Sequence, residues 1–185
     1  MRHFAMNRSL SAVVLTLAAA LATPAALAES AEEIDIKVDA TLETFKSEVQ
    51  GGQEFLQQAA GVLVFPKVIK AGLIVGGEHG KAALRVDGKS VGYYSTTAGS
   101  IGLQAGAQSK SEVIVFMTED ALKAFQASSG WEAGVDGNIA VVEWGAGQSL
   151  TTVDVKDPIV GFIFGNTGLM FDLSFEGSKF NKLDL

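Results

Sequence analysis

The chain has 185 residues, with 14 basic and 21 acidic side chains that give a formal net charge of −7. This balance argues against a nucleic-acid partner, because nucleic-acid binding depends on Lys and Arg that neutralise phosphates. The absence of cysteine excludes disulfides and thiolate metal ligands. The length and the 48% of hydrophobic residues fit one domain with a sizeable core and exclude a disordered chain.

The N-terminal segment has the features of a secretory signal. Basic residues come first, an apolar run follows at 10–22, and small residues lead up to Ala28. The apolar run is too short to span a bilayer as a stable helix, and a small-residue site is where such signals are cleaved. We therefore predict a Sec-type signal peptide over residues 1–28 and a mature chain that begins at Glu29.

The remaining residues, 29–185, are expected to form a single domain, because no linker or long repeat divides them. Loss of Arg2 and Arg8 with the signal lowers the 14 basic residues to 12 against 21 acidic ones, so the net charge of −7 becomes −9. The bacterial style of the signal predicts the periplasm as the location, with release outside the cell as the alternative.

Three segments show helical patterns. Residues 31–49 place an apolar residue at every third or fourth position, which is one face of a helix. Residues 53–60 could form a second, shorter helix, and residues 121–125 are expected to form a short internal helix after the N-cap Thr118. We expect the first helix to pack on a sheet; the alternative is a lipid- or partner-binding arm, which its acidic polar face disfavours. The apolar face of the first helix comprises Ile34, Val38, Leu42, Phe45 and Val49.

From Gly61 onward the patterns are those of strands separated by turns. The most regular is the alternation of apolar residues with glycine and glutamine over 101–108, which predicts a strand with two different faces. We expect a turn at 109–110 and a partner strand at 112–117. Glycine weakens a strand unless curvature or a close neighbour requires it, so this hairpin indicates a strongly bent sheet.

Turn signals elsewhere define the remaining strands. An apolar run at 61–65 ends at Pro66, residues 87–88 are typical of a tight turn, and a last hairpin is expected to turn at 166–167. The sequence predicts an α+β fold that is mostly β. It would be a strongly curved antiparallel sheet or barrel of about nine or ten short strands, with an N-terminal helix and one short internal helix.

Few residues could support catalysis or metal binding. His79 is the one histidine left after residues 1–28 are removed, and it lies beside Glu78. Neighbours on a strand point to opposite faces, so these two side chains are not expected to converge. The sequence has no Gly-x-Ser-x-Gly motif and no phosphate-binding loop. We therefore expect no enzymatic activity, no catalytic residues, no metal site and no cofactor.

Several segments together resemble the SYLF domain, a lipid-binding domain that is also described as actin-binding in fungal endocytic proteins. They are spread in order through nearly all of the chain after residue 28, and their joint order and spacing make the resemblance specific. The segments are AAGVLVFPKVIKAGLIVGGEHGKA (59–82), YYS (93–95), SIGLQAGAQSKSEVIVF (100–116), ALKAF (121–125) and GLMFDLSFEGSKF (168–180).

This resemblance implies a compact, glycine-rich antiparallel β architecture with helices and an affinity for membrane lipids, in eukaryotic members phosphoinositides. Our leading hypothesis is a non-enzymatic lipid-binding module of the bacterial cell envelope, whose partner is a membrane lipid or another apolar ligand. A loop of mixed basic and apolar residues can touch lipid headgroups. The candidate contacts lie on such a loop and near the last hairpin: Phe65, Lys67, Ile69, Lys70, Phe162 and Phe164.

Two other functions stay open. Unprotected strand edges pair readily with other chains. The chain is therefore alternatively a structural or protein-interaction protein of the periplasm without a lipid ligand. The third hypothesis is an envelope hydrolase that uses Glu78 and His79 as its acid–base pair.

Overall fold

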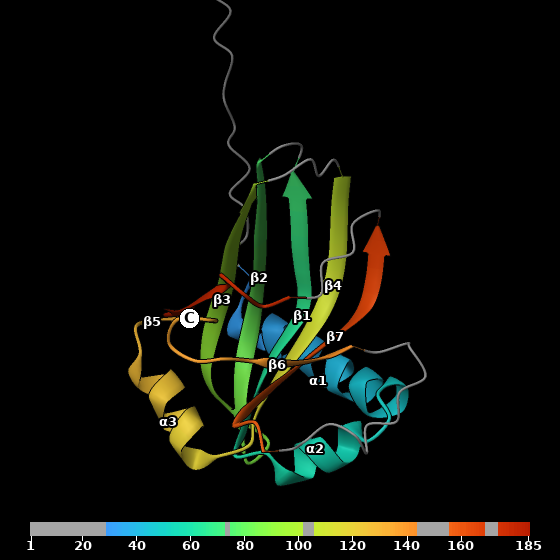
Figure 1. Ribbon diagram of the computed structural model, residues 1–185. Helices are drawn as coiled ribbons and strands as arrows, with labels where there is room; N and C mark the ends of the chain where they lie inside the picture. Colours follow the sequence, from blue (N-terminus) through green and yellow to red (C-terminus); the bar gives the residue numbers. More distant parts are fainter. Residues whose placement is uncertain (1–28, 73–74, 102–105, 144–155, 169–173) are drawn as a thin grey trace, which may run out of the picture.

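The structure is a computed structural model in which a strongly curled sheet is accompanied by helices (Figure 1), three of them in the described residues. Helix α1 (Ala31–Glu48) leads into α2 (Gly52–Gln58), and α3 (Glu119–Ala127) follows the fourth strand. The hydroxyls of Ser30 and Thr118 accept hydrogen bonds from backbone N–H groups in the first turns of α1 and α3, which fixes where both helices begin. The structure describes residues 29–72, 75–101, 106–143, 156–168 and 174–185.

Eight strands form one sheet in these described residues. Their order across the sheet is β5-β8-β3-β2-β1-β4-β7-β6, and every neighbouring pair is antiparallel except β6 and β7. The strands are β1 (Gly61–Gly72), β2 (Val75–Val86), β3 (Lys89–Ile101), β4 (Gly106–Phe116), β5 (Gly130–Glu132), β6 (Ala140–Glu143), β7 (Ile159–Gly168) and β8 (Lys179–Leu183).

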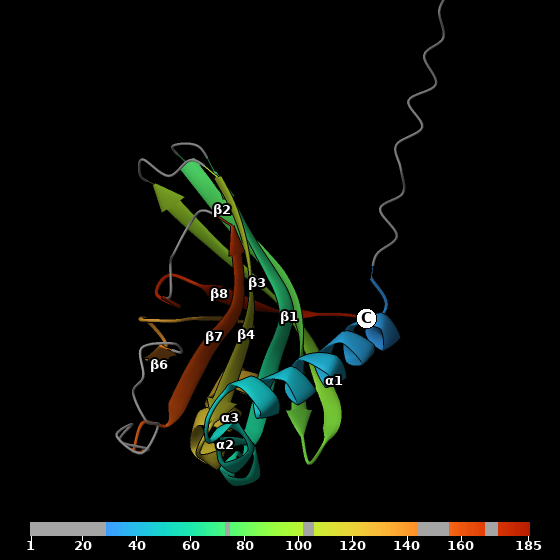
Figure 2. The ribbon, with the colours of Figure 1, turned by 90° about the vertical axis from the view of Figure 1, so that its right-hand side faces the viewer.

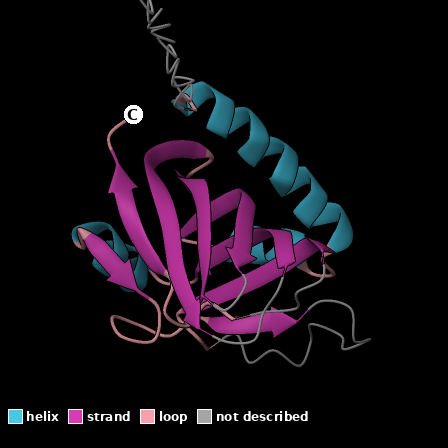
Figure 3. Ribbon diagram, turned by 90° about the horizontal axis from the view of Figure 1, so that it is seen from above, coloured by secondary structure: helices cyan, strands magenta, loops and turns pink. Residues whose placement is uncertain are grey.

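The curl gives the sheet an inner face and an outer face, each with its own apolar core (Figures 2 and 3). On the outer face, Phe45 of α1 packs on Phe162 of β7, with ring centroids 4.9 Å apart. On the inner face, Phe125 of α3 and Trp131 of β5 both contact the ring of Phe180 of β8. Because alternate residues of a strand face opposite ways, the central strands contribute to both cores.

The predicted fold class is confirmed. The chain is mostly β and strongly curved, with the N-terminal helix and the short internal helix in the expected places. The tight turn at 87–88 is present, and Asp87 and Gly88 have φ values of 50° and 74°, as a two-residue hairpin of this type requires. The described residues contain eight strands, against the predicted total of about nine or ten for the whole chain.

The predicted turn at Ser109 and Lys110 is wrong. Strand β4 continues through both residues, and they pair with Ile69 and Val68 of β1. Residues 106–108 and 112–116 therefore belong to the same strand, whose neighbours in the sheet are β1 and β7, and they do not pair with each other as a hairpin. The polar dipeptide resembles a turn in the sequence, but burial of Lys110 against carboxylates keeps the strand intact. Half of the alternating pattern, residues 102–105, lies outside the described residues.

The predicted loop after Phe65 and the predicted turn at 166–167 are also strand. Strand β1 passes through Pro66 with a bulge between Phe65 and Val68, where a residue without an N–H group is tolerated. Strand β7 continues through 166–167, and the final strand β8 pairs with β3 rather than with β7. Residues 169–173, which belong to the predicted last hairpin, lie outside the described residues.

Candidate functional site

A groove on the outer face is lined by residues at the start of α1 and on strands β1 and β2. Figure 2 shows α1 lying against the outer face of the sheet, part of which extends past this helix. The volume of the groove is about 570 Å³. The walls come from the N-terminal end of α1 and from strands β1 and β2, so the fold brings together segments that are distant in the sequence. The lining residues, which we call the outer groove, are Glu29, Ile34, Lys37, Pro66, Lys67, Ile69, His79 and Lys81.

A polar network and an aromatic contact hold α1 in place as one wall of the outer groove. Arg85 of β2 donates a hydrogen bond to Asp39 at 2.7 Å, and the hydroxyl of Tyr93 on β3 donates to Asp35 at 2.9 Å. Burial and the bond to Asp35 raise the pKa of Tyr93, so it remains a neutral donor at neutral pH. The other end of α1 is anchored by Phe45 in the outer core.

The outer groove is cationic although the protein is acidic. Lys67 of β1 and Lys81 of β2 are direct register partners, and both line the groove. Like charges opposite each other on neighbouring strands repel, so an anion between them would relieve an unfavourable interaction. Lys37 adds a third ammonium group, and Glu29 supplies the one carboxylate among the described lining residues.

The three lysines differ in their partners. Lys37 donates a hydrogen bond to the carboxylate of Glu29, and this bond raises the pKa of Lys37. A carboxylate of the chain itself therefore occupies the place that an external anion would take at this lysine. Within the described residues, Lys67 and Lys81 form no ion pair.

Apolar surface adjoins these cations. Ile69 is 48% exposed, Pro66 is half-buried beside it, and Ile34 is a buried part of the lining. Ammonium groups can bind a phosphate or carboxylate while an exposed aliphatic side chain contacts the hydrocarbon part of the same molecule. The groove is therefore suited to an amphiphile with an anionic head.

The structure brings two of the six sequence-predicted contacts, Lys67 and Ile69, together in the outer groove. The other four are buried. Phe65 faces the inner core and Lys70 is only 5% exposed, while Phe162 and Phe164 pack beneath α1. Lipid contact at all six positions stays a prediction, but only Lys67 and Ile69 offer exposed side chains for it.

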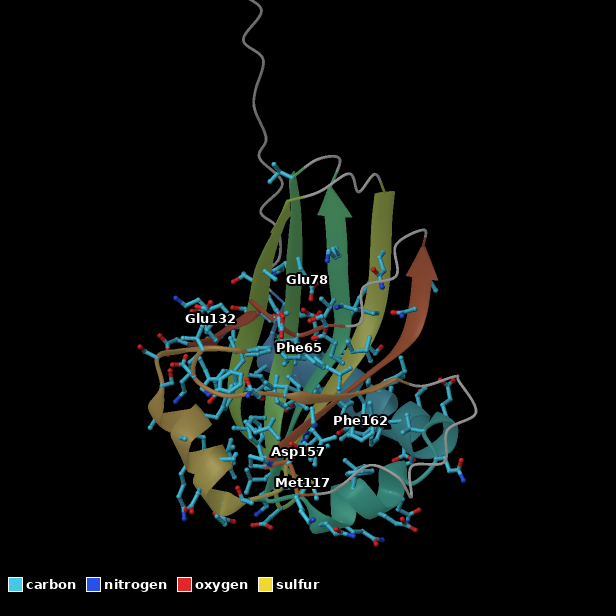
Figure 4. The ribbon with its side chains drawn as sticks, in the orientation of Figure 1. Phe65, Glu78, Met117, Glu132, Asp157 and Phe162 are labelled. Carbon is cyan, nitrogen blue, oxygen red and sulfur yellow. The ribbon has the colours of Figure 1, made fainter. Side chains whose placement is uncertain are left out.

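A second polar group lies on the inner face of the sheet. Lys110 Nζ lies 2.9 Å from Glu112 Oε1 and 3.3 Å from Glu78 Oε1. Figure 4 shows Glu78 above Phe65, at the upper end of the inner apolar core. This inner polar cluster, whose members are at most 6% exposed, comprises Lys70, Glu78, Gln108, Lys110 and Glu112.

Burial dominates the acid–base behaviour of this cluster. It raises the pKa of Glu112 to about 7, against the opposing attraction of Lys110. Burial lowers the pKa of Lys110, but the charges of Glu112 and Glu78 outweigh it and the net shift is upward. Neither carboxylate oxygen of Glu112 has a hydrogen-bond partner of good geometry among the described residues. The cluster is therefore a costly, pH-sensitive part of the core.

Sequence reasoning missed Lys37 and Lys81 because only the strand register and the placement of α1 bring them beside Lys67. It also missed the inner polar cluster. Gln108, Lys110 and Glu112 alternate with other residues in phase with the buried Ile114 and Phe116, and this spacing is the signal that could have located them. The prediction that the side chains of Glu78 and His79 do not converge is confirmed. His79 lines the outer groove, whereas Glu78 lies in the inner polar cluster.

The described residues contain no group of three or more His, Cys, Asp or Glu that could hold a metal ion. Among the helices that the structure describes, none combines the length and the apolar character needed to cross a membrane.

Comparison with known families identifies the class of protein. Residues 97–184 match the family model Ysc84, described as "Las17-binding protein actin regulator". This match confirms the resemblance to the SYLF domain over residues 97–184, and the Ysc84 (SYLF) family is a family of binding domains. A search of curated proteins gives no match. The matched residues begin within β3, so α1, β1 and β2, which form the outer groove, precede them.

Proposed function

We propose that the chain is a non-enzymatic lipid-binding module of the bacterial cell envelope and that it binds anionic lipid headgroups in the outer groove. The observation that carries this proposal is the direct register pairing of Lys67 with Lys81 beside the exposed Ile69. The match of residues 97–184 to a family of binding domains supports binding rather than turnover. The predicted signal over residues 1–28 supports export to the periplasm.

The size of the expected attraction is modest. A basic side chain close to an anionic membrane surface contributes about 1 kcal/mol, and salt weakens the attraction. The net charge of −7 repels the same surface at longer range. The protein must therefore approach the membrane with the outer groove facing it, and the exposed Ile69 adds an apolar contact that salt does not screen.

Vesicle co-sedimentation tests the proposal. We expect the protein to sediment with vesicles made of equal parts phosphatidylglycerol and phosphatidylcholine, and to stay in the supernatant with pure phosphatidylcholine. Raising the ionic strength from about 0.01 M to about 1 M shortens the screening length roughly tenfold, so it should release most of the bound protein. Absence of binding to the anionic vesicles at low salt would refute the proposal.

One observation favours the alternative of a protein partner. Strand β8 pairs with β3 only over Tyr93–Thr97 of β3. Strand β6, Ala140–Glu143, pairs with β7 only over Val160–Ile163 of β7. Beyond these ranges, the sides of β3 and β7 that face β8 and β6 have no pairing strand in the described part of the chain, and such edges can accept an added strand. Crosslinking in intact cells that recovers one envelope protein, with no lipid retained, would favour this alternative.

A further inference from the structure

The position of Glu29 links the outer groove to processing of the chain. Glu29 lines the groove and immediately precedes Ser30, the N-cap of α1. A capping box fixes this point: the Ser30 hydroxyl accepts from the Glu33 N–H at 3.2 Å, and the Glu33 carboxylate accepts from the Ser30 N–H at 3.0 Å. Glu29, whose backbone nitrogen is one residue from this fixed helix start, therefore lies at the groove.

This nitrogen has a different charge before and after cleavage of a signal at residues 1–28. In the uncleaved chain it is an uncharged amide joined to Ala28. In a chain that begins at Glu29 it is an α-amino group, whose ordinary pKa of about 7.7 to 8.0 leaves it mostly protonated at neutral pH.

We propose that signal cleavage completes the outer groove by placing the α-ammonium group of Glu29 there as a fourth cationic group for an anionic lipid headgroup. This inference rests on the proposed lipid-binding function. In the uncleaved chain, three lysines face one carboxylate in the groove; after cleavage, a fourth cation stands on the same residue as that carboxylate. Binding is then strongest in the processed, exported form.

The surroundings of the new ammonium favour an anion. The other titratable and charged groups that line the groove are Lys37 of α1, which is paired with the Glu29 carboxylate, Lys67 of β1, and His79 and Lys81 of β2. The other nearby carboxylate, Glu33, is engaged by the backbone of Ser30. Four cationic groups around one carboxylate leave an excess of positive charge that a phosphate can neutralise.

The experiment compares the chain that begins at Glu29 with a free α-amino group and the same chain with an Nα-acetyl group. The probe is the anionic vesicle of phosphatidylglycerol and phosphatidylcholine at low salt. At about pH 7 we expect the free form to bind about fivefold more tightly, the effect of one basic group near an anionic surface. At about pH 9.5 the α-amino group is mostly neutral, so the difference in affinity between the two forms should disappear. His79 is the same in both forms, so it cannot produce the difference between them.

The outcomes separate this inference from the proposed function. If both forms bind equally at about pH 7, the α-amino group is not part of the site, and the inference is overturned while lipid binding stands. If neither form binds, the proposed function itself fails and this inference with it. Intact-mass measurement of the exported protein must give a chain that begins at Glu29; any other N-terminus contradicts the inference.

Discussion

At the scale of single residues, the surroundings of Glu112 oppose its charged form. Its carboxyl group is buried beside Lys110, and burial raises its pKa from 4.5 to about 7. The folded state therefore holds a proton that the unfolded state releases between these pH values. The contribution of Glu112 to the free energy of unfolding is fully present below about pH 4.5 and is lost as the pH rises through about 7.

Replacement of Glu112 by Gln removes this titration while keeping the size of the side chain. At pH 4 or below we expect the variant and the wild type to have similar free energies of unfolding. Above about pH 7 the variant should gain up to about 3 kcal/mol relative to the wild type, because each pKa unit corresponds to about 1.4 kcal/mol. Urea denaturation across this range measures the difference. The exposed Glu176→Gln is the control, and a Glu112→Gln effect that does not change with pH would contradict the assignment.

Ile69 provides the residue-scale test of the apolar part of the outer groove. Ile69→Asp should weaken binding to anionic vesicles about tenfold or more, because it removes apolar contact and adds a charge that the membrane repels. Val135→Asp is the matched control, since Val135 is also exposed but lies outside the groove. Equal losses in the two variants would show that the effect comes from net charge alone.

At the scale of elements, the docking of α1 and α2 on β7 depends on Phe162. Its ring lies 4.9 Å from that of Phe45 on α1 and 5.0 Å from that of Phe55 on α2. Phe162→Ala should lower the free energy of unfolding by about 3–5 kcal/mol, because it leaves a cavity under both helices. Chemical denaturation measures this loss.

The same position tests whether Phe162 also contacts lipid. Phe162→Leu keeps an apolar side chain of similar volume and should preserve the fold, with a cost below that of alanine. Because Phe162 is only 1% exposed, we expect this variant to bind vesicles as the wild type does. A specific loss of vesicle binding in a folded Phe162→Leu protein would show that the buried ring does reach lipid.

Local chemistry explains which elements could be predicted from the sequence. Ser30 and Thr118 mark helix starts and residues 87–88 mark a tight turn through interactions with their immediate neighbours. The dipeptide Ser109-Lys110 was misread because its place inside a strand depends on Glu78, a residue on another strand. A sequence pattern shows the conformational preference of neighbouring residues, but it does not show that a polar side chain forms an ion pair with a residue on another strand.

The candidate site could be predicted only in part for the same reason. Lys67 and Ile69 stand close together in the sequence, and their mixed basic and apolar character indicated a lipid contact. Lys37 and Lys81 join them only through the packing of α1 and the register of β1 with β2. Phe65 looked equally accessible, but strand alternation turns it into the inner core.

At the scale of the whole molecule, the central claim is that one cationic groove directs an acidic protein to an anionic membrane. The net charge of −7 makes non-specific attraction unfavourable, so binding must come from where the lysines are placed. Two variants that remove the same total charge at different places therefore show whether binding depends on the lysines of the groove or only on the net charge. Lys67→Ala/Lys81→Ala removes the paired cations of the groove, and Lys89→Ala/Lys123→Ala removes two exposed lysines outside it.

The groove variant should fold normally, because removing two like charges from opposite register positions relieves repulsion. The most direct measurement is the affinity of both variants for vesicles of phosphatidylglycerol and phosphatidylcholine at low salt. We predict that Lys67→Ala/Lys81→Ala binds about 30-fold more weakly than the wild type, from about 1 kcal/mol for each lysine, and that Lys89→Ala/Lys123→Ala changes little. Equal affinities of the two variants would contradict the assignment of lipid binding to the outer groove.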